Sequence, residues 1–337
     1  MKKNKVLIIR FSSFGDIVQC SSVVDVLARE AVVHWATRAD FDSLVKLNSN
    51  LEKVYSLDKK LGLVGLINFS LKLRRENYTH VYDAHNNLRS KIIMCFLRLR
   101  LNSPKTLTRS KDRIKRILLF KFRKNLFPSP FKGIESYLNP LKKWGFNTAL
   151  SSPIVTWQFQ DSTLTKINEV LKNQLQNSSF VALAPSAAWE MKRWPVDYWK
   201  KVIELMPDKN FVIFGGKDDL FCEELVVGNE TRVFNLAGLL SLAESSLLLK
   251  HAQLIISGDT GLLHVADVLS VKGISLMGPT AFGFTTSALI KTLEVNLSCR
   301  PCSKDGRGSC SQSIYKKCMI DILPSVVSEE AHKIIRD

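Results

Sequence analysis

The strongest constraint on the fold is a regular alternation of short apolar runs and helical patterns along this 337-residue chain. In the first half the strand-like runs are 5–10, 32–36, 53–56 and 79–83, and the helical patterns are 16–30, 61–75 and a segment from Leu88. In the second half the strand-like runs are 180–184, 210–214, 232–235, 253–257 and 273–277, again separated by helical patterns. Strands that alternate with helices favour parallel sheets covered by helices. We therefore expect an α/β fold with two Rossmann-like, doubly wound parallel sheets.

The length of the chain and one polar stretch predict two domains. The chain is longer than one typical domain, and Gly145, Ser152 and Pro153 precede a helical pattern that starts near Asp161. We expect an N-terminal domain over 1–152 and a C-terminal domain over 153–337 that face a central cleft. The last helix is a candidate to pack back on the first domain. No GxGxxG sequence follows the first strand-like run, which argues against an oxidoreductase that binds a dinucleotide.

Most of the net charge of +17 lies in one segment. Residues 98–124 hold eleven Lys or Arg and one acid, Asp112, which gives a local charge of +10. Such a segment attracts nucleic acid, anionic lipid or a phosphorylated substrate, and the interleaved Ile114, Ile117 and Phe120 are typical of a helix that binds a surface. A solvated helix face is the alternative. No zinc-finger, RNP-type or heptad pattern supports nucleic acid, which we do not expect as a partner.

The apolar runs and the cysteines predict a cytoplasmic protein. No apolar run reaches the roughly 18 residues that a membrane-spanning helix needs, and the run after the basic N-terminus is too short for a signal peptide. Seven cysteines, an odd number, fit a reducing compartment. Four of them, Cys299, Cys302, Cys310 and Cys318, would permit a structural zinc site, but free thiols in a stabilised loop are the favoured interpretation.

The junction between the first strand and the first helix carries the first candidate site. Ser12 and Ser13 offer hydroxyl groups, Gly15 allows a ligand close to the backbone, and Asp16 stands at the start of the helix. From spacing alone, capping of the helix is the favoured role of Asp16, and a general base is the alternative. One carboxylate can serve both roles.

Two junctions of the second half could bind a nucleotide. Ser186, Lys192 and Arg193 follow the strand-like run 180–184, where they could clamp a diphosphate. Asp219 lies beyond a glycine pair at the end of the next strand, where an acid can accept hydrogen bonds from ribose hydroxyls.

A third junction, between the run 253–257 and the helix that follows it, favours an anion. The start of that helix presents free N–H groups at the carboxyl edge of the sheet. We expect Thr260 and Gly261 to meet a phosphate, and the carboxylate of Asp259 to hold the loop or pair with Lys192. His264 could face the ligand, although a packed histidine is the common alternative.

Taken together, these stretches resemble glycosyltransferase family 9, the bacterial lipopolysaccharide heptosyltransferases. The matching pieces, in the family's order, are 10–16 (RFSSFGD), 82–90 (YDAHNNLRS), 192–195 (KRWP), 214–216 (FGG), 258–264 (GDTGLLH), 277–280 (MGPT) and the cysteine loop from Cys299. The resemblance implies a GT-B fold and an inverting transfer of heptose from ADP-heptose to the lipopolysaccharide inner core. In this chain His85, Asn86 and Asn87 replace the more usual Gln-Gly pair, so the acceptor is the less specific part of the resemblance.

The resemblance also assigns roles by position. It implies that Asp16 is the general base and that Lys192 is the ligand of the donor phosphate. The other implied donor-binding residues are Ser186, Asp219, Leu240, Asp259, Thr260, Gly261, Leu262 and His264. The implied acceptor-binding residues are Arg10, Ser12, Ser13, Asp83, His85, Arg89, Arg109, Arg113 and Arg116.

These inferences predict an enzyme that needs no metal, although magnesium could assist. Its acceptor would be Kdo-lipid A or heptosyl-Kdo-lipid A, whose anionic groups match the basic segment, at the cytoplasmic face of the inner membrane. One alternative is a family member that uses another nucleotide sugar or another core position. The other is a protein without enzymatic activity that binds nucleic acid or anionic lipid through residues 98–124.

Overall fold

The computed structural model describes residues 4–99 and 101–336, so Met1 to Lys3, Arg100 and Asp337 lie outside the described residues. The chain divides into two compact units. Unit 1 comprises Met1–Asp112 and Ile134–Gln158, and unit 2 comprises Arg113–Gly133 and Phe159–Asp337.

This division differs from the expected one at 152/153 in two respects. The backbone N–H of Thr156 donates to Asp25 at 2.9 Å, and that of Gln158 donates to the carbonyl of Leu47 at 2.7 Å, so residues 153–158 stay with unit 1. The segment Arg113–Gly133 belongs to unit 2, because its aromatic side chains pack around Phe282. The basic segment 98–124 is therefore divided between the two units.

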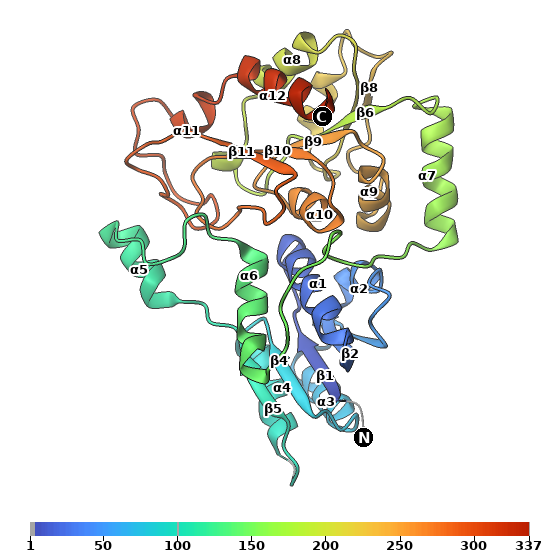
Figure 1. The fold of residues 1–337 in the computed structure, drawn as a ribbon, viewed down its shortest axis with the longest axis vertical. Coiled ribbons are helices and arrows are strands. Elements are labelled where there is room, and N and C mark those ends of the chain that lie inside the picture. Colours follow the sequence, from blue (N-terminus) through green and yellow to red (C-terminus); the bar gives the residue numbers. More distant parts are fainter. Residues whose placement is uncertain (1–3, 100, 337) are drawn as a thin grey trace. The chain divides into compact units, whose positions relative to one another are not determined.

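Five parallel strands form the sheet of unit 1, in the order β3-β2-β1-β4-β5 (Figure 1). The strands are β1 (Asn4–Ile9), β2 (Ala31–Arg38), β3 (Lys53–Leu57), β4 (His80–Asp83) and β5 (Lys105–Thr108). The helices are α1 (Phe14–Ala28), α2 (Asp42–Val45), α3 (Gly62–Arg74), α4 (Leu88–Arg98) and α6 (Gly133–Leu138). The winding reverses between β1 and β4, where Ile9 pairs with Asp83. Ligands of open parallel sheets bind at the carboxyl ends of strands beside such a reversal.

Six parallel strands form the sheet of unit 2, in the order β11-β10-β9-β6-β7-β8. The strands are β6 (Phe180–Ala184), β7 (Asn210–Ile213), β8 (Val233–Asn235), β9 (Leu254–Gly258), β10 (Gly273–Met277) and β11 (Ile290–Glu294). The helices are α5 (Arg113–Phe122), α7 (Asp161–Asn173), α8 (Val196–Leu205), α9 (Leu242–Leu249), α10 (Gly261–Leu269), α11 (Lys317–Ile320) and α12 (Pro324–Arg336). Here the winding reverses between β6 and β9, where Ala184 pairs with Ser257.

The central strands are apolar because helices cover both faces of each sheet. Every residue of β6, β9 and β10 is buried. In unit 1 the last four residues of β1 are buried in the same way. The expected α/β class and its two doubly wound parallel sheets are confirmed.

Two strands were not among those predicted. They are β5 and β11, which lie at the edges of the two sheets. Both are short and partly exposed, so they lack a continuous apolar run. Helix α12 belongs to unit 2, where its Val327 and Ala331 are buried in the core. Within the described residues, no helix is both long enough and apolar enough to cross a membrane.

Candidate active site

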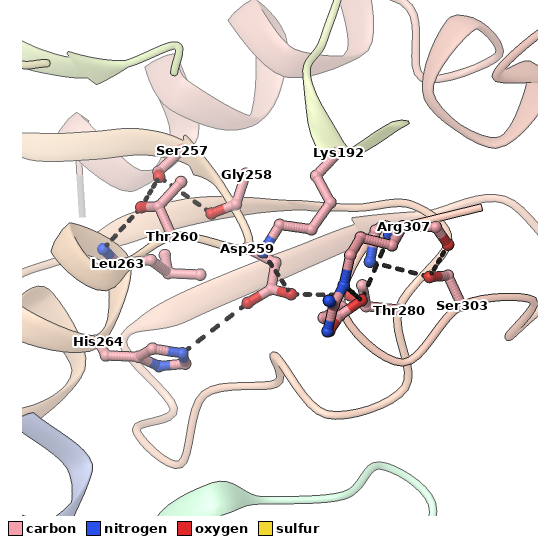
Figure 2. Close-up of polar contacts among 12 residues, drawn as sticks. Lys192, Ser257, Gly258, Asp259, Thr260, Leu263, His264, Thr280, Ser303 and Arg307 are labelled. Atoms are coloured by element: carbon pink, nitrogen blue, oxygen red, sulfur yellow. Dashed lines mark hydrogen bonds and ion pairs between the residues drawn. The ribbon is translucent and has the colours of Figure 1, made fainter. Parts of the chain in front are cut away.

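The carboxyl ends of β6 and β9 bring two of the predicted loops together in unit 2 (Figure 2). The loop after β6 contains a short 3-10 turn, Glu190–Lys192, and the loop after β9 contains Asp259. Gly258 allows the two loops to approach closely, because a Cβ there would lie 3.2 Å from the carbonyl oxygen of Lys192, which is a tight contact. The reversal of winding thus places the predicted donor residues at the edge where such sheets bind nucleotides.

An ion pair between Lys192 and Asp259 is the centre of this site. Lys192 Nζ lies 3.1 Å from Asp259 Oδ2, and both side chains are mostly buried. Thr280 Oγ1 donates to the same oxygen at 2.8 Å, and His264 Nε2 lies 3.9 Å from Oδ1 (Figure 2). The expected pairing of Asp259 with Lys192 is therefore present, and His264 is a buried neighbour of the carboxylate.

The charges around Asp259 keep it ionised. Burial by itself raises the pKa of Asp259, but the positive charge of Lys192, the interaction with His264 and the hydrogen bond from Thr280 together lower it below its usual value. The carboxylate consequently holds Lys192 in place. Its negative charge also competes with an incoming phosphate for Lys192.

Helix α10 begins directly beside this pair. Thr260 is its N-cap, and Thr260 Oγ1 accepts a hydrogen bond from the backbone N–H of Leu263 at 3.3 Å. Ser257 Oγ lies 2.9 Å from the same hydroxyl oxygen. The first N–H groups of a helix lack partners within the helix and favour an anion, so the start of α10 at Gly261 and Leu262 suits a phosphate.

The cysteine loop covers Lys192. Gly306, with a φ of +95°, lies so close that a Cβ would stand 2.6 Å from Lys192 Cγ and 3.0 Å from the Cβ of Trp189. Arg307 stacks on the ring of Trp189 at 5.2 Å, and Ser303 Oγ accepts a hydrogen bond from the N–H of Gly306 at 2.9 Å. This contact could not be predicted from the sequence, because no local pattern relates residue 306 to residue 192.

The four cysteines of the loop are free thiols in this structure. Among the described residues, no group of three or more His, Cys, Asp or Glu side chains is placed to hold a metal ion. In this structure the loop 299–318 is instead held by side chains of other types, such as Arg300, which donates to the carbonyl of Gly278 at 2.6 Å.

Asp219 follows β7, and both of its carboxylate oxygens accept hydrogen bonds from the protein itself. Its Oδ2 accepts from the N–H of Gly216 at 2.7 Å, its Oδ1 accepts from the hydroxyl of Ser186, and Arg193 lies 3.9 Å away. Asp219 and Ser186 therefore hold the two loops together. Leu240 is half-buried beside the N-cap of α9, Ser241.

In unit 1 the carboxyl end of β1 holds Asp16 at the start of α1. Ser13 is the N-cap, and its backbone N–H donates to Asp16 Oδ2 at 3.4 Å in a capping box, so the capping role is confirmed. The Ser13 hydroxyl donates to the same oxygen at 2.8 Å. Arg10 pairs with the same oxygen at 2.6 Å, and Tyr137 donates its hydroxyl to Oδ1 at 2.8 Å. The Asp16 side chain nevertheless remains 37% exposed, so the carboxylate is accessible to a ligand.

The partners of Asp16 make it a strong acid. Burial raises the pKa of Asp16, but the Arg10 guanidinium and the hydrogen bonds from Tyr137 and Ser13 outweigh burial and hold the pKa well below its usual range. Arg109 reinforces the cluster, since its guanidinium carbon lies 3.9 Å from the centre of the Tyr137 ring. Tyr137 was not among the predicted residues, and no motif marks it.

Three other predicted acceptor residues lie between the end of β4 and the first turn of α4. Asp83 is buried and accepts hydrogen bonds from the N–H of Asn86 at 2.7 Å and the hydroxyl of Ser90 at 2.8 Å, so it supports the loop before α4. Arg89 is exposed at the start of α4. Burial and the charge of nearby Arg10 lower the pKa of His85 to about 4, so His85 is neutral near pH 7.

The three arginines predicted from the basic segment belong to different units. Arg109 belongs to unit 1 and donates to Ser136 Oγ at 2.7 Å, whereas Arg113 and Arg116 belong to α5 in unit 2. Arg116 stacks over the ring of Phe282 at 4.5 Å. The sequence did not reveal this division, because the three arginines are close together along the chain. Their role in binding the acceptor stays a prediction.

Solved structures share this architecture. A glycosyltransferase of family 9 from Veillonella parvula matches with a TM-score of 0.80 at 18% identity, covering 100% of this chain and 99% of that one. The E. coli ADP-heptose lipopolysaccharide heptosyltransferase II matches with a TM-score of 0.72 at 19% identity, covering 98% of each chain. These similarities define the fold as GT-B.

The family follows from the sequence comparison. A model described as glycosyltransferase family 9 (heptosyltransferase) matches residues 67–316, and the chain therefore belongs to this family. Lipooligosaccharide heptosyltransferase 2 of Haemophilus ducreyi is 26% identical over 197 residues, which cover 55% of this chain and 56% of that protein. The chain thus spans about half the length of this and similar curated relatives. Lipopolysaccharide heptosyltransferase 1 of Campylobacter coli is 24% identical over 302 residues, covering 82% of this chain and 84% of that protein.

Proposed function

We propose that this chain is an inverting heptosyltransferase that moves heptose from ADP-heptose to the inner core of lipopolysaccharide. The observation that carries the proposal is the Lys192–Asp259 pair beside the start of α10, at the reversal of winding in unit 2. Relatives support the choice of donor: the E. coli heptosyltransferase WaaC has been solved with ADP and with ADP-2-deoxy-2-fluoro heptose.

In this proposal unit 2 holds the donor diphosphate. Lys192 turns from Asp259 toward a phosphate oxygen, or bridges the two, while Thr280 and His264 keep the Asp259 carboxylate in place. The N–H groups at the start of α10 bind the same phosphates. Charge that develops on the leaving ADP is thus met by fixed positive groups, which lowers the barrier to departure.

Unit 1 supplies the base. The acceptor hydroxyl oxygen forms a bond to the anomeric carbon as the bond from that carbon to the diphosphate oxygen breaks, and attack from the opposite face inverts the centre. The hydroxyl proton passes to Asp16. A carboxylate with a lowered pKa is a weak base, so transfer occurs late, once the new bond has made the hydroxyl proton strongly acidic.

We propose that the reaction needs no resident metal, because Lys192 and the helix start supply the positive charge that a cation would otherwise bring. A chelator should leave the transfer rate unchanged. A loss that added magnesium restores would instead assign this role to the ion.

The acceptor in this proposal is a lipid-linked, anionic core sugar, which places the enzyme at the cytoplasmic face of the inner membrane. Exposed Arg89, in the first turn of α4, is suited to a carboxylate of the acceptor, whereas neutral His85 can only hydrogen bond. The exact acceptor position belongs to this proposal as well.

Calorimetric titration with ADP-heptose tests the donor site. Lys192→Met should weaken binding about tenfold or more, because it removes a charged phosphate ligand. Lys333→Met is the matched control: this lysine of α12 in unit 2 pairs with Glu330 at 2.9 Å and should not change binding. Equal affinity of wild type and Lys192→Met, or tighter binding of another nucleotide sugar, would contradict the proposal.

A further inference from the structure

Helix α5 (Arg113–Phe122) has one face that is anchored to unit 2. Leu119 is buried, and the ring of Phe120 meets Phe282 edge-on with 6.0 Å between the ring centres. Beyond the helix, Phe127 and Phe131 pack on the same ring at 5.2 and 5.0 Å. These four phenylalanines form what we call the Phe282 cluster.

Further contacts fix this anchored face. Arg116 stacks over the Phe282 ring, and Arg123 donates to the carbonyls of Cys299 and Pro301 at 2.9 and 3.0 Å. Side chains at 116, 119, 120 and 123 share one side of a helix, given its period of 3.6 residues. The orientation of α5 on unit 2 is therefore determined by packing.

The opposite face of α5 is apolar and exposed. Ile114 is 76% exposed and Ile117, one turn later, is 55% exposed. Phe122 at the end of the helix is 61% exposed, and Leu126 beyond it is 45% exposed. A surface helix of a globular protein normally turns its apolar face inward, so apolar side chains on both faces indicate a second partner.

The charges around this face identify the partner. Residues 113–124 contain six Lys or Arg and no Asp or Glu. Arg113, Lys115 and Lys121 are exposed beside the apolar side chains. A helix with an apolar strip flanked only by cations is suited to the interface of an anionic bilayer, which accepts apolar side chains and attracts positive charge. The backbone of a nucleic acid would satisfy the cations but not Ile114 and Ile117.

We propose that α5 docks on an anionic phospholipid membrane, inserting Ile114, Ile117 and Phe122 at the level of the headgroups. The inference rests on the proposed function in that a lipid-linked acceptor gives the enzyme a reason to bind a bilayer. The Phe282 cluster joins the docking helix to unit 2, because Phe282 lies next to Gly283, where a Cβ would stand 2.4 Å from Asp259 Oδ1. The membrane contact and the donor site thus share one short loop.

Co-sedimentation of the full chain with vesicles tests the inference. The vesicles contain either phosphatidylcholine alone or phosphatidylcholine with phosphatidylglycerol. Wild type should bind the anionic vesicles. The double variant Ile114→Ser/Ile117→Ser should bind at least about tenfold more weakly, because it lacks the two apolar side chains that would be buried in the bilayer. Arg113→Gln/Lys115→Gln/Lys121→Gln should also weaken binding and reduce its dependence on salt.

The matched control is Leu220→Ser/Val227→Ser. These side chains of unit 2 are 78% and 75% exposed, as much as Ile114, but lie outside α5. The control should bind like wild type. Equal vesicle binding by wild type and Ile114→Ser/Ile117→Ser would overturn the inference. So would self-association or nucleic-acid binding through these isoleucines in the absence of vesicle binding.

An activity assay separates this inference from the proposed function. With a water-soluble acceptor that lacks acyl chains, Ile114→Ser/Ile117→Ser should transfer at the wild-type rate, and with acceptor embedded in vesicles it should be slower. A wild type that binds vesicles but transfers no heptose would contradict the proposed function and leave the docking helix supported. Slower transfer to the soluble acceptor would count against docking as the role of these residues.

Discussion

The hydroxyl of Tyr137 donates a 2.8 Å hydrogen bond to Oδ1 of Asp16, and so connects residues 121 positions apart in the chain. The tyrosine is buried, while the carboxylate keeps part of its surface exposed. Because Arg10 and Ser13 occupy the other oxygen, Asp16 is fixed from both sides before any substrate binds. Such an arrangement orients a base at the expense of its basicity.

Tyr137→Phe should alter both the orientation and the pKa of Asp16. The hydrogen bond from Tyr137 helps to lower the pKa of Asp16, so its removal raises that pKa. The loss of kcat on acidification should then begin at a higher pH than in wild type, and kcat should fall about tenfold because the carboxylate is less well oriented. The pH dependence of kcat measures both effects.

Tyr55→Phe is the control for this variant. Tyr55 is also a buried tyrosine of unit 1 whose hydroxyl bonds to a carboxylate, that of Glu76, but it has no contact with Asp16. Each variant loses one hydrogen bond, so the free energy of unfolding should fall by about 1 kcal/mol in both. An unchanged acid limb in Tyr137→Phe, or the same change in Tyr55→Phe, would show that Tyr137 is not a positioning residue.

Gly306→Ala should weaken donor binding through Lys192. A Cβ at Gly306 would stand 2.6 Å from Lys192 Cγ, so the lysine must move. Gly308 has a similar φ, +107° against +95°, but a Cβ there has nothing within 4 Å. Gly306→Ala should therefore raise the KM for the donor severalfold above that of Gly308→Ala, which shares only the backbone strain. Equal KM values for the two variants would rule out a role for the loop in placing Lys192.

Glu76 should stabilise unit 1 in a pH-dependent way. Hydrogen bonds from Lys5, Lys53 and Tyr55 lower the pKa of Glu76 from 4.5 to about 2. A carboxylate whose folded pKa is lowered contributes stability above its unfolded pKa, and this contribution disappears as the pH falls from 4.5 through about 2. Glu76→Gln should therefore cost about 1 kcal/mol near neutral pH, since the site is partly solvated, and progressively less below the unfolded pKa. Chemical denaturation across this range measures it, and a cost independent of pH would contradict the assignment.

The sequence predicted the features that have a local signal. Buried strands such as β6 and β9 appear as apolar runs because both of their faces are covered. The capping role of Asp16 was predictable because a carboxylate at the start of a helix commonly satisfies its unpaired N–H groups. The pairing of Lys192 with Asp259 was predictable once both loops were assigned to carboxyl ends of strands in one sheet.

Features that depend on distant residues were not predicted. Tyr137 reaches Asp16, and Gly306 reaches Lys192, through tertiary packing that no local pattern encodes. The edge strand β5 is short and half-exposed, so it lacks both an apolar run and a clear alternation. The segment Arg113–Gly133 belongs to unit 2 because it packs on Phe282, which lies far along the chain from this segment.

The rate of heptose transfer by Asp16→Asn at saturating ADP-heptose tests the account most directly. The amide keeps the size of the side chain and its oxygen can still accept from Tyr137, while the Ser13 hydroxyl can turn to accept from the amide NH2, so the start of α1 should be largely retained. It cannot take a proton from the acceptor. We predict that kcat falls at least about 100-fold while the KM for the donor, which is bound by unit 2, stays the same. A kcat close to that of wild type would contradict the assignment of Asp16 as the base.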